Sequence, residues 1–252
     1  MKNNQWQASA YTEHAAFVSS MATEVVSLLA PVAGESILDL GCGDGQLAEY
    51  ISAQGCLVSC VDASPSMVSA AKARGLSAAL ANGNKLEFSN HFDAVFSNAA
   101  LHWMLDPEAV LEGVYRALKA KGRFVAEMGG QGNISALLKA MTDVFSENKD
   151  FGTFNNPWFF PSESDYRRLL ERTGFRVDSI ERISRPTPLA SGIEQWLAVF
   201  ADSICADLNA QQKKRFFTQV KVRLVGTLYS ENDGWVADYV RLRFKAVKDS
   251  TD

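Results

Sequence analysis

A glycine-rich segment at residues 37–45 constrains the fold more than any other part of the chain. Its sequence is Ile-Leu-Asp-Leu-Gly-Cys-Gly-Asp-Gly. The apolar run predicts a buried strand, the glycines a tight turn, and residues 46–54 the helix that follows. Glycines at alternate positions permit positive φ angles and leave no Cβ atoms between the backbone and a ligand. Because a helix begins with unpaired N–H groups, we expect a polar ligand against this loop.

The composition is that of a globular α/β chain. Of its 252 residues 47% are hydrophobic and 21% charged, and a net charge of −4 argues against a nucleic acid held by charge alone. The cysteines lack metal-type spacing, so we expect no metal site and reduced thiols in a cytoplasmic protein. They are Cys42, Cys56, Cys60 and Cys205. No run approaches the roughly 20 apolar residues of a membrane span, so we expect no membrane partner. The sequence leaves open whether the protein is a monomer or a homodimer.

A second predicted strand, residues 57–61, ends in Asp62. This carboxylate lies about 20 residues beyond Gly41, where the second strand of such a sheet presents an acid to the hydroxyls of a ribose. A helix-capping role is the alternative. Ser64 and Pro65 then predict the start of a helix. Met67, one turn into that helix, belongs either to the core or to one face of an adenine.

A further predicted strand, residues 92–97, runs into Asn98-Ala99-Ala100-Leu101-His102-Trp103. Ligands of open α/β sheets lie outside the carboxyl ends of the strands, so this loop is predicted to form the floor of the pocket. His102 has the titration range of a general base, and Trp103 can shape a substrate slot. For His102 the alternative is a loop-holding role through hydrogen bonds.

Together these features resemble the class I S-adenosylmethionine (SAM) methyltransferases. Their first motif is acid-x-G-x-G-x-G, which matches Asp39 to Gly45. Gln46 stands where a dinucleotide fingerprint has its third Gly or Ala, which speaks against a nicotinamide dehydrogenase. The resemblance covers residues 37–128. It implies a Rossmann-like α/β fold with a seven-stranded, mostly parallel sheet, helices on both faces, an antiparallel last strand and a helical cap inserted before that strand.

The resemblance also implies SAM as the cofactor and S-adenosyl-L-homocysteine as its product. Asn82 stands where the family usually has an acid that takes the adenine amino group, and the N–H of Gly83 follows it; a simple Asn-Gly turn is the alternative. The family folds its N-terminal segment over the cofactor, which singles out Tyr11. The cofactor-binding residues implied are Tyr11, Asp39, Gly41, Cys42, Gly43, Gly45, Asp62, Ala63, Met67, Asn82, Gly83, Asn98 and Ala99.

We expect one methyltransferase domain over residues 1–252. Residues 1–33 would form an N-terminal lid and helix, residues 34–132 the SAM-binding core, and residues 133–252 a substrate-side half with a helical cap at about 190–228. Further elements are predicted from periodicity and capping residues. They are a strand at 122–128, an aromatic loop at 151–160, a helix capped by Ser162, a strand at 175–183, a cap helix reaching Leu208, and a last strand at 235–247.

Within the family, the pattern looks most like the branch of trans-aconitate and malonyl-carrier methyltransferases. Those enzymes methylate a carboxylate oxygen and usually have Gln where this chain has His102. A carboxylate is nucleophilic at pH 7 and needs a clamp rather than a base, which an arginine fork supplies best. Arg185 is the first candidate, and Arg241 and Arg243 are weaker ones. The predicted substrate-binding residues of this small-molecule site are His102, Trp103, Trp158, Phe159 and Arg185.

Two other functions stay open at this point. An N- or C-methylation of a small metabolite would use His102 as a catalytic base. A non-catalytic SAM-binding protein would keep the cofactor motifs, because methyl transfer need not leave a catalytic signature in the sequence.

Overall fold

The computed structural model describes residues 23–249, so the predicted cofactor residue Tyr11 lies outside the described residues. The described chain forms two compact units, which we name the sheet unit and the helical unit. The sheet unit consists of residues 23–131, 158–182 and 242–249, and the helical unit of residues 132–157 and 183–241.

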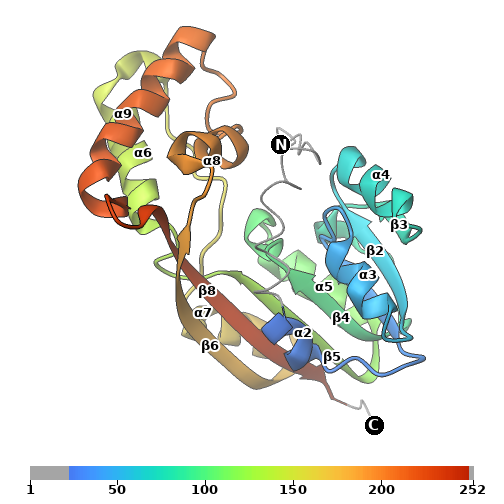
Figure 1. Ribbon diagram of the computed structural model, residues 1–252. Helices are drawn as coiled ribbons and strands as arrows, with labels where there is room; N and C mark the ends of the chain where they lie inside the picture. Colours follow the sequence, from blue (N-terminus) through green and yellow to red (C-terminus); the bar gives the residue numbers. More distant parts are fainter. Residues whose placement is uncertain (1–22, 250–252) are drawn as a thin grey trace. The chain divides into compact units, whose positions relative to one another are not determined.

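One β-sheet organises the fold (Figure 1), in the strand order β3-β2-β1-β4-β5-β8-β6. The pairs among the first five strands of this order are parallel. A two-residue strand, β7, pairs with β8 outside this order. The strands are β1 (Ser36–Leu40), β2 (Leu57–Asp62), β3 (Ser77–Leu80), β4 (Phe92–Asn98), β5 (Leu118–Gly129), β6 (Phe175–Pro188), β7 (Tyr229–Ser230) and β8 (Gly234–Lys248). The predicted Rossmann-like sheet is confirmed, with β7 as a small addition to its seven strands.

The last strand, β8, runs antiparallel to its neighbour β6. The carboxylate of Glu181 on β6 lies 3.8 Å from Arg243 on β8. Just beyond the end of β6, the Leu189 N–H donates to the carbonyl oxygen of Trp235. Residue numbers on β8 therefore fall as those on β6 rise, which only antiparallel strands allow. The predicted antiparallel last strand is confirmed.

Helices cover both faces of the sheet. Successive side chains of a strand point to opposite faces, so neighbouring strand residues pack against helices on different sides of the sheet. Leu38 and Phe124 belong to a buried cluster that includes residues of α5 and α7. Their strand neighbours Ile37 and Val125 belong to a second cluster with residues of α2 and α3. The helices are α2 (Thr23–Leu29), α3 (Gln46–Ser52), α4 (Pro65–Ala73), α5 (Pro107–Ala117), α6 (Ser135–Glu147), α7 (Glu163–Thr173), α8 (Gly192–Phe200) and α9 (Ala210–Leu228), with short 3-10 helices η1 (Gly83–Lys85), η2 (Leu101–Trp103) and η3 (Lys149–Phe151). In residues 23–249 no helix is long and apolar enough to cross a membrane.

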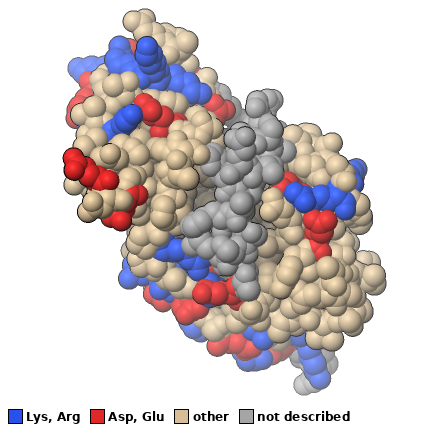
Figure 2. All heavy atoms as spheres, viewed as in Figure 1, with Lys and Arg blue, Asp and Glu red and all other residues tan. Residues whose placement is uncertain are grey.

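The helical unit is built on the packing of α6 against α9. The ring of Phe145 on α6 lies edge-on to that of Phe216 on α9, with centroids 5.3 Å apart. Lys and Arg side chains gather over α9 in Figure 2. They are compensated within the same unit, as in the pair between Lys221 and Glu194 at 3.2 Å. The cap predicted at about residues 190–228 contains α8 and α9 but not α6. The sequence did not reveal the contact of α6 with α9, because it joins segments far apart in the chain.

Three predicted boundaries are wrong. β5 begins at Leu118 rather than at residue 122, because the strand continues through an irregularity where Lys121 has a φ of 63°. β6 continues through Pro186 and ends at Pro188. As the terminal strand of the sheet it needs no N–H on its outer side, so prolines two residues apart are tolerated there. α8 ends at Phe200 rather than at residue 208, and turns follow it.

A buried ion-pair cluster ties β8 to β5 and α2. Arg243 donates from Nε to the carboxylate of Glu127 at 2.8 Å and from Nη2 to that of Glu24 at 2.6 Å. Arg243 and Glu127 are both buried. Breaking such a pair leaves an uncompensated buried charge. Arg243, a weaker candidate for binding substrate, is therefore committed to holding the sheet together.

Candidate functional site

The glycine loop between β1 and α3 is the centre of the candidate site. Gly41, Gly43 and Gly45 have φ angles of 76°, 57° and 86°. A Cβ on Gly41 would overlap Ala100, and one on Gly45 would lie 2.5 Å from Leu76 Cδ1. A Cβ on Gly43 would meet no atom of residues 23–249 within 4 Å. The outer two glycines therefore permit close packing, whereas the middle one faces open space from which a ligand can approach the backbone.

Asp62, at the end of β2, holds this loop in place. Its Oδ2 accepts a hydrogen bond from the Gly43 N–H at 3.0 Å, and its Oδ1 accepts one from the Ser64 N–H at 2.8 Å. The Gly41 N–H donates to the carbonyl oxygen of Val61 at 2.8 Å. Each carboxylate oxygen has lone pairs for a further donor. Asp62 can therefore brace the loop and accept from ligand hydroxyls at the same time.

A second carboxylate, Asp39 of β1, is buried close to Asp62. Burial and then the charge of Asp62 raise the pKa of Asp39 to about 7. Burial also raises the pKa of Asp62, against the hydrogen bonds from the backbone of Ser64, Gly43 and Ala63. Since both carboxylates are costly to charge, a ligand with positive charge and hydroxyl groups would stabilise them. These donors and acceptors fit the sulfonium, the amino group and the ribose of SAM.

Two contacts around the loop carry no clear signal in the sequence. Arg74 donates from Nη2 to the Asp44 carboxylate at 3.1 Å and from Nε to the Asp44 carbonyl at 2.9 Å, which ties the loop to the end of α4. The Sδ of Met104 lies 2.6 Å from the position of a Cβ on Gly83, and its Cε lies 3.7 Å from one on Gly41. Met104 therefore lies between the glycine loop and the Asn82-Gly83 turn. For the contact of Arg74, the one possible sequence signal was the acid Asp44 inside the glycine loop.

The remaining cofactor candidates flank Asp62 and η1. Asn82 Oδ1 accepts from the Asn84 N–H at 3.0 Å, so the Asn-Gly turn is present. The same oxygen keeps a lone pair for an adenine amino group. Met67 is buried, whereas Ala63 is exposed. The Cys42 thiol, between two of the loop glycines, donates to the Gly43 carbonyl at 3.5 Å.

The end of β4 has a strained backbone beside the glycine loop. Ala99 has a φ of 55°, which a residue with a Cβ rarely adopts, and its N–H donates to the Glu127 carbonyl at 2.8 Å. The hydroxyl of buried Ser97 donates to the Leu40 carbonyl at 2.7 Å. Asn98 lies between these two fixed residues. Strain of this kind clusters at functional sites.

His102 is fixed by a hydrogen bond to its ring. The Gly129 N–H donates to His102 Nδ1 at 3.2 Å. Because Nδ1 accepts, the neutral ring carries its proton on Nε2. The backbone carbonyl of His102 accepts from the Phe159 N–H at 2.9 Å. In the neutral ring Nδ1 is therefore the acceptor for Gly129, and Nε2 carries the proton.

The last residues of the aromatic loop, 158–160, pack against η2 within the sheet unit. The ring of Trp158 lies edge-on to that of Trp103, with centroids 5.4 Å apart. Trp158 is buried. The structure thus brings together four of the five predicted substrate residues, His102, Trp103, Trp158 and Phe159. The fifth, Arg185, lies on β6 in the helical unit.

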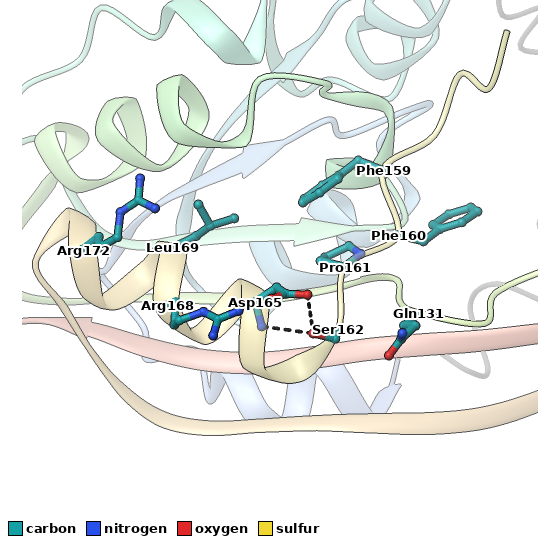
Figure 3. Close-up of a pocket in the computed structure, with 9 residues that line it drawn as sticks. All are labelled: Gln131, Phe159, Phe160, Pro161, Ser162, Asp165, Arg168, Leu169 and Arg172. Atoms are coloured by element: carbon teal, nitrogen blue, oxygen red, sulfur yellow. Dashed lines mark hydrogen bonds and ion pairs between the residues drawn. The ribbon is translucent and has the colours of Figure 1, made fainter.

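A pocket of about 420 Å³ lies beside the aromatic loop (Figure 3). Its charged side chains are already paired, Arg168 with Asp165 and Arg172 with Glu108. The lining residues are Gln131, Phe159, Phe160, Pro161, Ser162, Asp165, Arg168, Leu169 and Arg172. None of them belongs to the glycine loop, so this pocket is separate from the residues that fit SAM. No cluster of His, Cys, Asp or Glu in the described part of the chain could hold a metal ion.

Known proteins resemble this chain in sequence and in structure. A family model described as a methyltransferase domain matches residues 38–126. An uncharacterised methyltransferase of Schizosaccharomyces pombe is 39% identical, over 99% of this chain and 100% of that protein. The trans-aconitate 2-methyltransferase of Mycobacterium tuberculosis is 28% identical, over 69% of each chain. A solved structure of Haemonchus contortus phosphoethanolamine N-methyltransferase 2, with phosphomonomethylethanolamine and S-adenosylhomocysteine, has a TM-score of 0.58 at 21% identity, covering 92% of this chain and 53% of that one.

Gly43→Ala should separate ligand binding from folding. The new methyl group meets no atom of the described residues, so its cost is the strain of an L residue at positive φ, about 1–2 kcal/mol. It projects into the open space at the loop, so titration calorimetry should show S-adenosylhomocysteine binding weakened by about tenfold or more. Gly41→Ala is the matched control, because its methyl group overlaps Ala100 and should destabilise the fold itself. Unchanged affinity in Gly43→Ala would contradict this geometry.

Asp39→Asn should change how stability depends on pH. Because the pKa of Asp39 is raised from 3.8 to about 7, the folded chain binds this proton more tightly than the unfolded chain does. Wild-type stability from this group is therefore present below about pH 4 and lost as the pH rises through 7. In guanidinium unfolding without ligand, Asp39→Asn should be more stable than wild type at pH 8, by roughly 1.4 kcal/mol per unit of pKa shift, and no more stable at pH 4. A difference that is the same at both pH values would refute the assignment.

Proposed function

Because this chain belongs to the methyltransferase family, we propose that it uses SAM to methylate a carboxylate oxygen of a small organic acid. The observation that carries the proposal is the pairing of Asp62 with Gly43. The Asp62 carboxylate accepts a hydrogen bond from Gly43 and can also accept hydrogen bonds from ribose hydroxyls. Gly43, the middle glycine of the loop, is open to a ligand.

The residues around this loop have distinct parts in holding the cofactor. Asp62 would accept from the ribose hydroxyls, and Asn82 would accept from the adenine amino group. Asp39 supplies a second, buried carboxylate close to Asp62, and a cationic ligand would favour its ionised form. SAM, when bound, supplies an activated methyl group on a positively charged sulfur. The remaining task of the chain is to align the acceptor and to exclude water from it.

A carboxylate acceptor suits the groups that this chain presents. The trans-aconitate 2-methyltransferase that resembles it acts, by its name, on an organic acid. A carboxylate is ionised at neutral pH and needs no base to become a nucleophile. The side chains of Trp103 and Trp158 form an apolar wall that can exclude water. Arg185 belongs to the helical unit, and its part in binding the acid stays a prediction from the sequence.

The geometry of His102 favours a donor over a base. Its Nδ1 accepts from Gly129, so in the neutral ring the acceptor nitrogen is engaged and the proton lies on Nε2. A glutamine at this position would offer the same pair, an amide oxygen for Gly129 and an N–H donor for the substrate. This equivalence explains how His102 can stand where related enzymes usually have Gln. It also argues against N- or C-methylation with His102 as the base.

Incubation of the purified chain with methyl-labelled SAM and a panel of small di- and tricarboxylic acids tests the reaction. We expect a labelled product that releases volatile methanol in mild alkali, because methyl esters hydrolyse there and N- or C-methyl groups do not. The matching amides should give no labelled product. An alkali-stable product would contradict carboxylate methylation, and a chain that binds SAM without turning over any acceptor would favour a non-catalytic role.

His102→Gln should keep most of the activity on the same acid. The glutamine oxygen replaces Nδ1 as the acceptor for Gly129, and its N–H₂ group replaces the Nε2 donor. His102→Ala removes both and leaves the Gly129 N–H unpaired, so its kcat/KM should fall by about 10- to 100-fold. The measurement is kcat/KM from pH 6 to 8. Loss of activity in His102→Gln equal to that in His102→Ala would restore the base mechanism.

A further inference from the structure

The pocket beside the aromatic loop (Figure 3) contains none of the residues that fit SAM. Its volume of about 420 Å³ is that of a small-molecule site, for which roughly 300–1,000 Å³ is usual. One side of the pocket is helix α7, and the other is the chain at residues 159–162. Its whole lining belongs to the sheet unit, so this unit by itself forms the pocket.

Backbone hydrogen bonds hold the wall of this pocket in place. The Phe159 N–H donates to the His102 carbonyl at 2.9 Å, and the Gln131 N–H donates to the Pro161 carbonyl at 2.8 Å. Phe160 lies between these two anchored residues in sequence, and its ring centroid is 5.7 Å from that of His102. A wall that the protein's own backbone fixes on both sides of Phe160 is largely formed before a ligand arrives, as is usual for small-molecule sites.

Two side chains give the pocket an apolar surface. Phe159 and Leu169 pack against the buried core of the sheet unit and are themselves only partly buried. Both line the pocket, together with Pro161. The apolar body of a ligand would cover the part of these side chains that still faces water.

The charged side chains of the lining favour an anion. They are two arginines, Arg168 and Arg172, and one acid, Asp165, which leaves one positive charge in excess. The arginines lie four residues apart on α7 and so share a face of the helix. Asp165 pairs with Arg168, and Glu108 of α5, which is not part of the lining, pairs with Arg172.

Both arginines keep donors for a ligand. Among residues 23–249, each of them pairs through Nη2 only, so the N–H groups on Nε and Nη1 meet no protein acceptor. Both ion pairs are exposed, and exposed pairs contribute little to stability, so a ligand anion can share or replace the partner at small cost. The side-chain amide of Gln131, also in the lining, has no hydrogen-bond partner in the described part of the chain.

We propose that this pocket is a second small-molecule site, which binds a carboxylate with an apolar body. The carboxylate lies at the guanidinium groups of Arg168 and Arg172, whose N–H forks match its two oxygens. The body of the ligand covers Phe159 and Leu169. Binding here needs neither SAM nor methyl transfer, so the site stands apart from the proposed function.

Titration calorimetry on the full chain without SAM tests this assignment. The probes are 3-phenylpropionate and its uncharged amide, 3-phenylpropionamide, and wild type should bind the acid more tightly than the amide. Arg172→Gln should weaken binding of the acid by about three- to fivefold, the range for an exposed ion pair. Arg167→Gln is the matched control, because Arg167 lies on the same helix and pairs with Glu171 outside the pocket, so binding should not change.

Gln131 allows a test in both directions. Its side chain has no partner among the described residues, so Gln131→Glu and Gln131→Lys change the charge of the lining without breaking a contact there. Gln131→Glu should weaken binding of the acid and Gln131→Lys should strengthen it, each by roughly threefold, because an added charge repels or attracts the carboxylate. Neither change should alter binding of the uncharged amide.

Several results would overturn the site. Wild type would then bind the acid no more tightly than the amide, or would bind neither of them. The same affinity for the acid in wild type, Arg172→Gln and both Gln131 variants would place the acid elsewhere on the chain. Binding of inorganic phosphate as tight as that of the acid would leave no role for the apolar surface and would overturn the ligand class.

Discussion

The site depends on the two hydrogen bonds that Asp62 accepts from backbone N–H groups. Through them one carboxylate at the end of β2 fixes Gly43 in the glycine loop and Ser64 at the start of α4. The acid that would receive the ribose is therefore also the acid that shapes the loop. Asp39, buried close by, adds a second carboxylate whose pKa is raised. A cationic ligand with hydroxyl groups would satisfy both.

In the proposed reaction the protein has two tasks at the acceptor, which are to position it and to exclude water. The Gly129 N–H donates to His102 Nδ1, and the ring of Trp158 lies edge-on to that of Trp103. Such a site suits an acceptor that is already ionised.

Local signals predicted far more of this structure than long-range contacts. The glycine loop and the Ser64 and Ser162 helix caps depend on residues adjacent in sequence, and the structure contains all three. The path of β6 through its prolines depends on its place at the edge of the sheet, which periodicity does not reveal. The structural role of Arg243 depends on its ion pair with Glu127, which is distant in sequence. Without that contact the sequence offered Arg243 as a candidate for binding substrate. Met104 carries no sequence signal, because only the folded chain brings it to the glycine loop.

The central claim is that the glycine loop and Asp62 hold SAM. Titration calorimetry with SAM on wild type, Asp62→Asn and Asp165→Asn tests it most directly, with NAD as the control ligand. Asp165 is the matched control, because it is an acid in a pocket separate from the loop. Wild type and Asp165→Asn should bind SAM equally, Asp62→Asn should bind it at least about tenfold more weakly, and NAD should bind none of them. Absence of SAM binding to wild type at millimolar concentration, or binding of NAD in its place, would contradict the account.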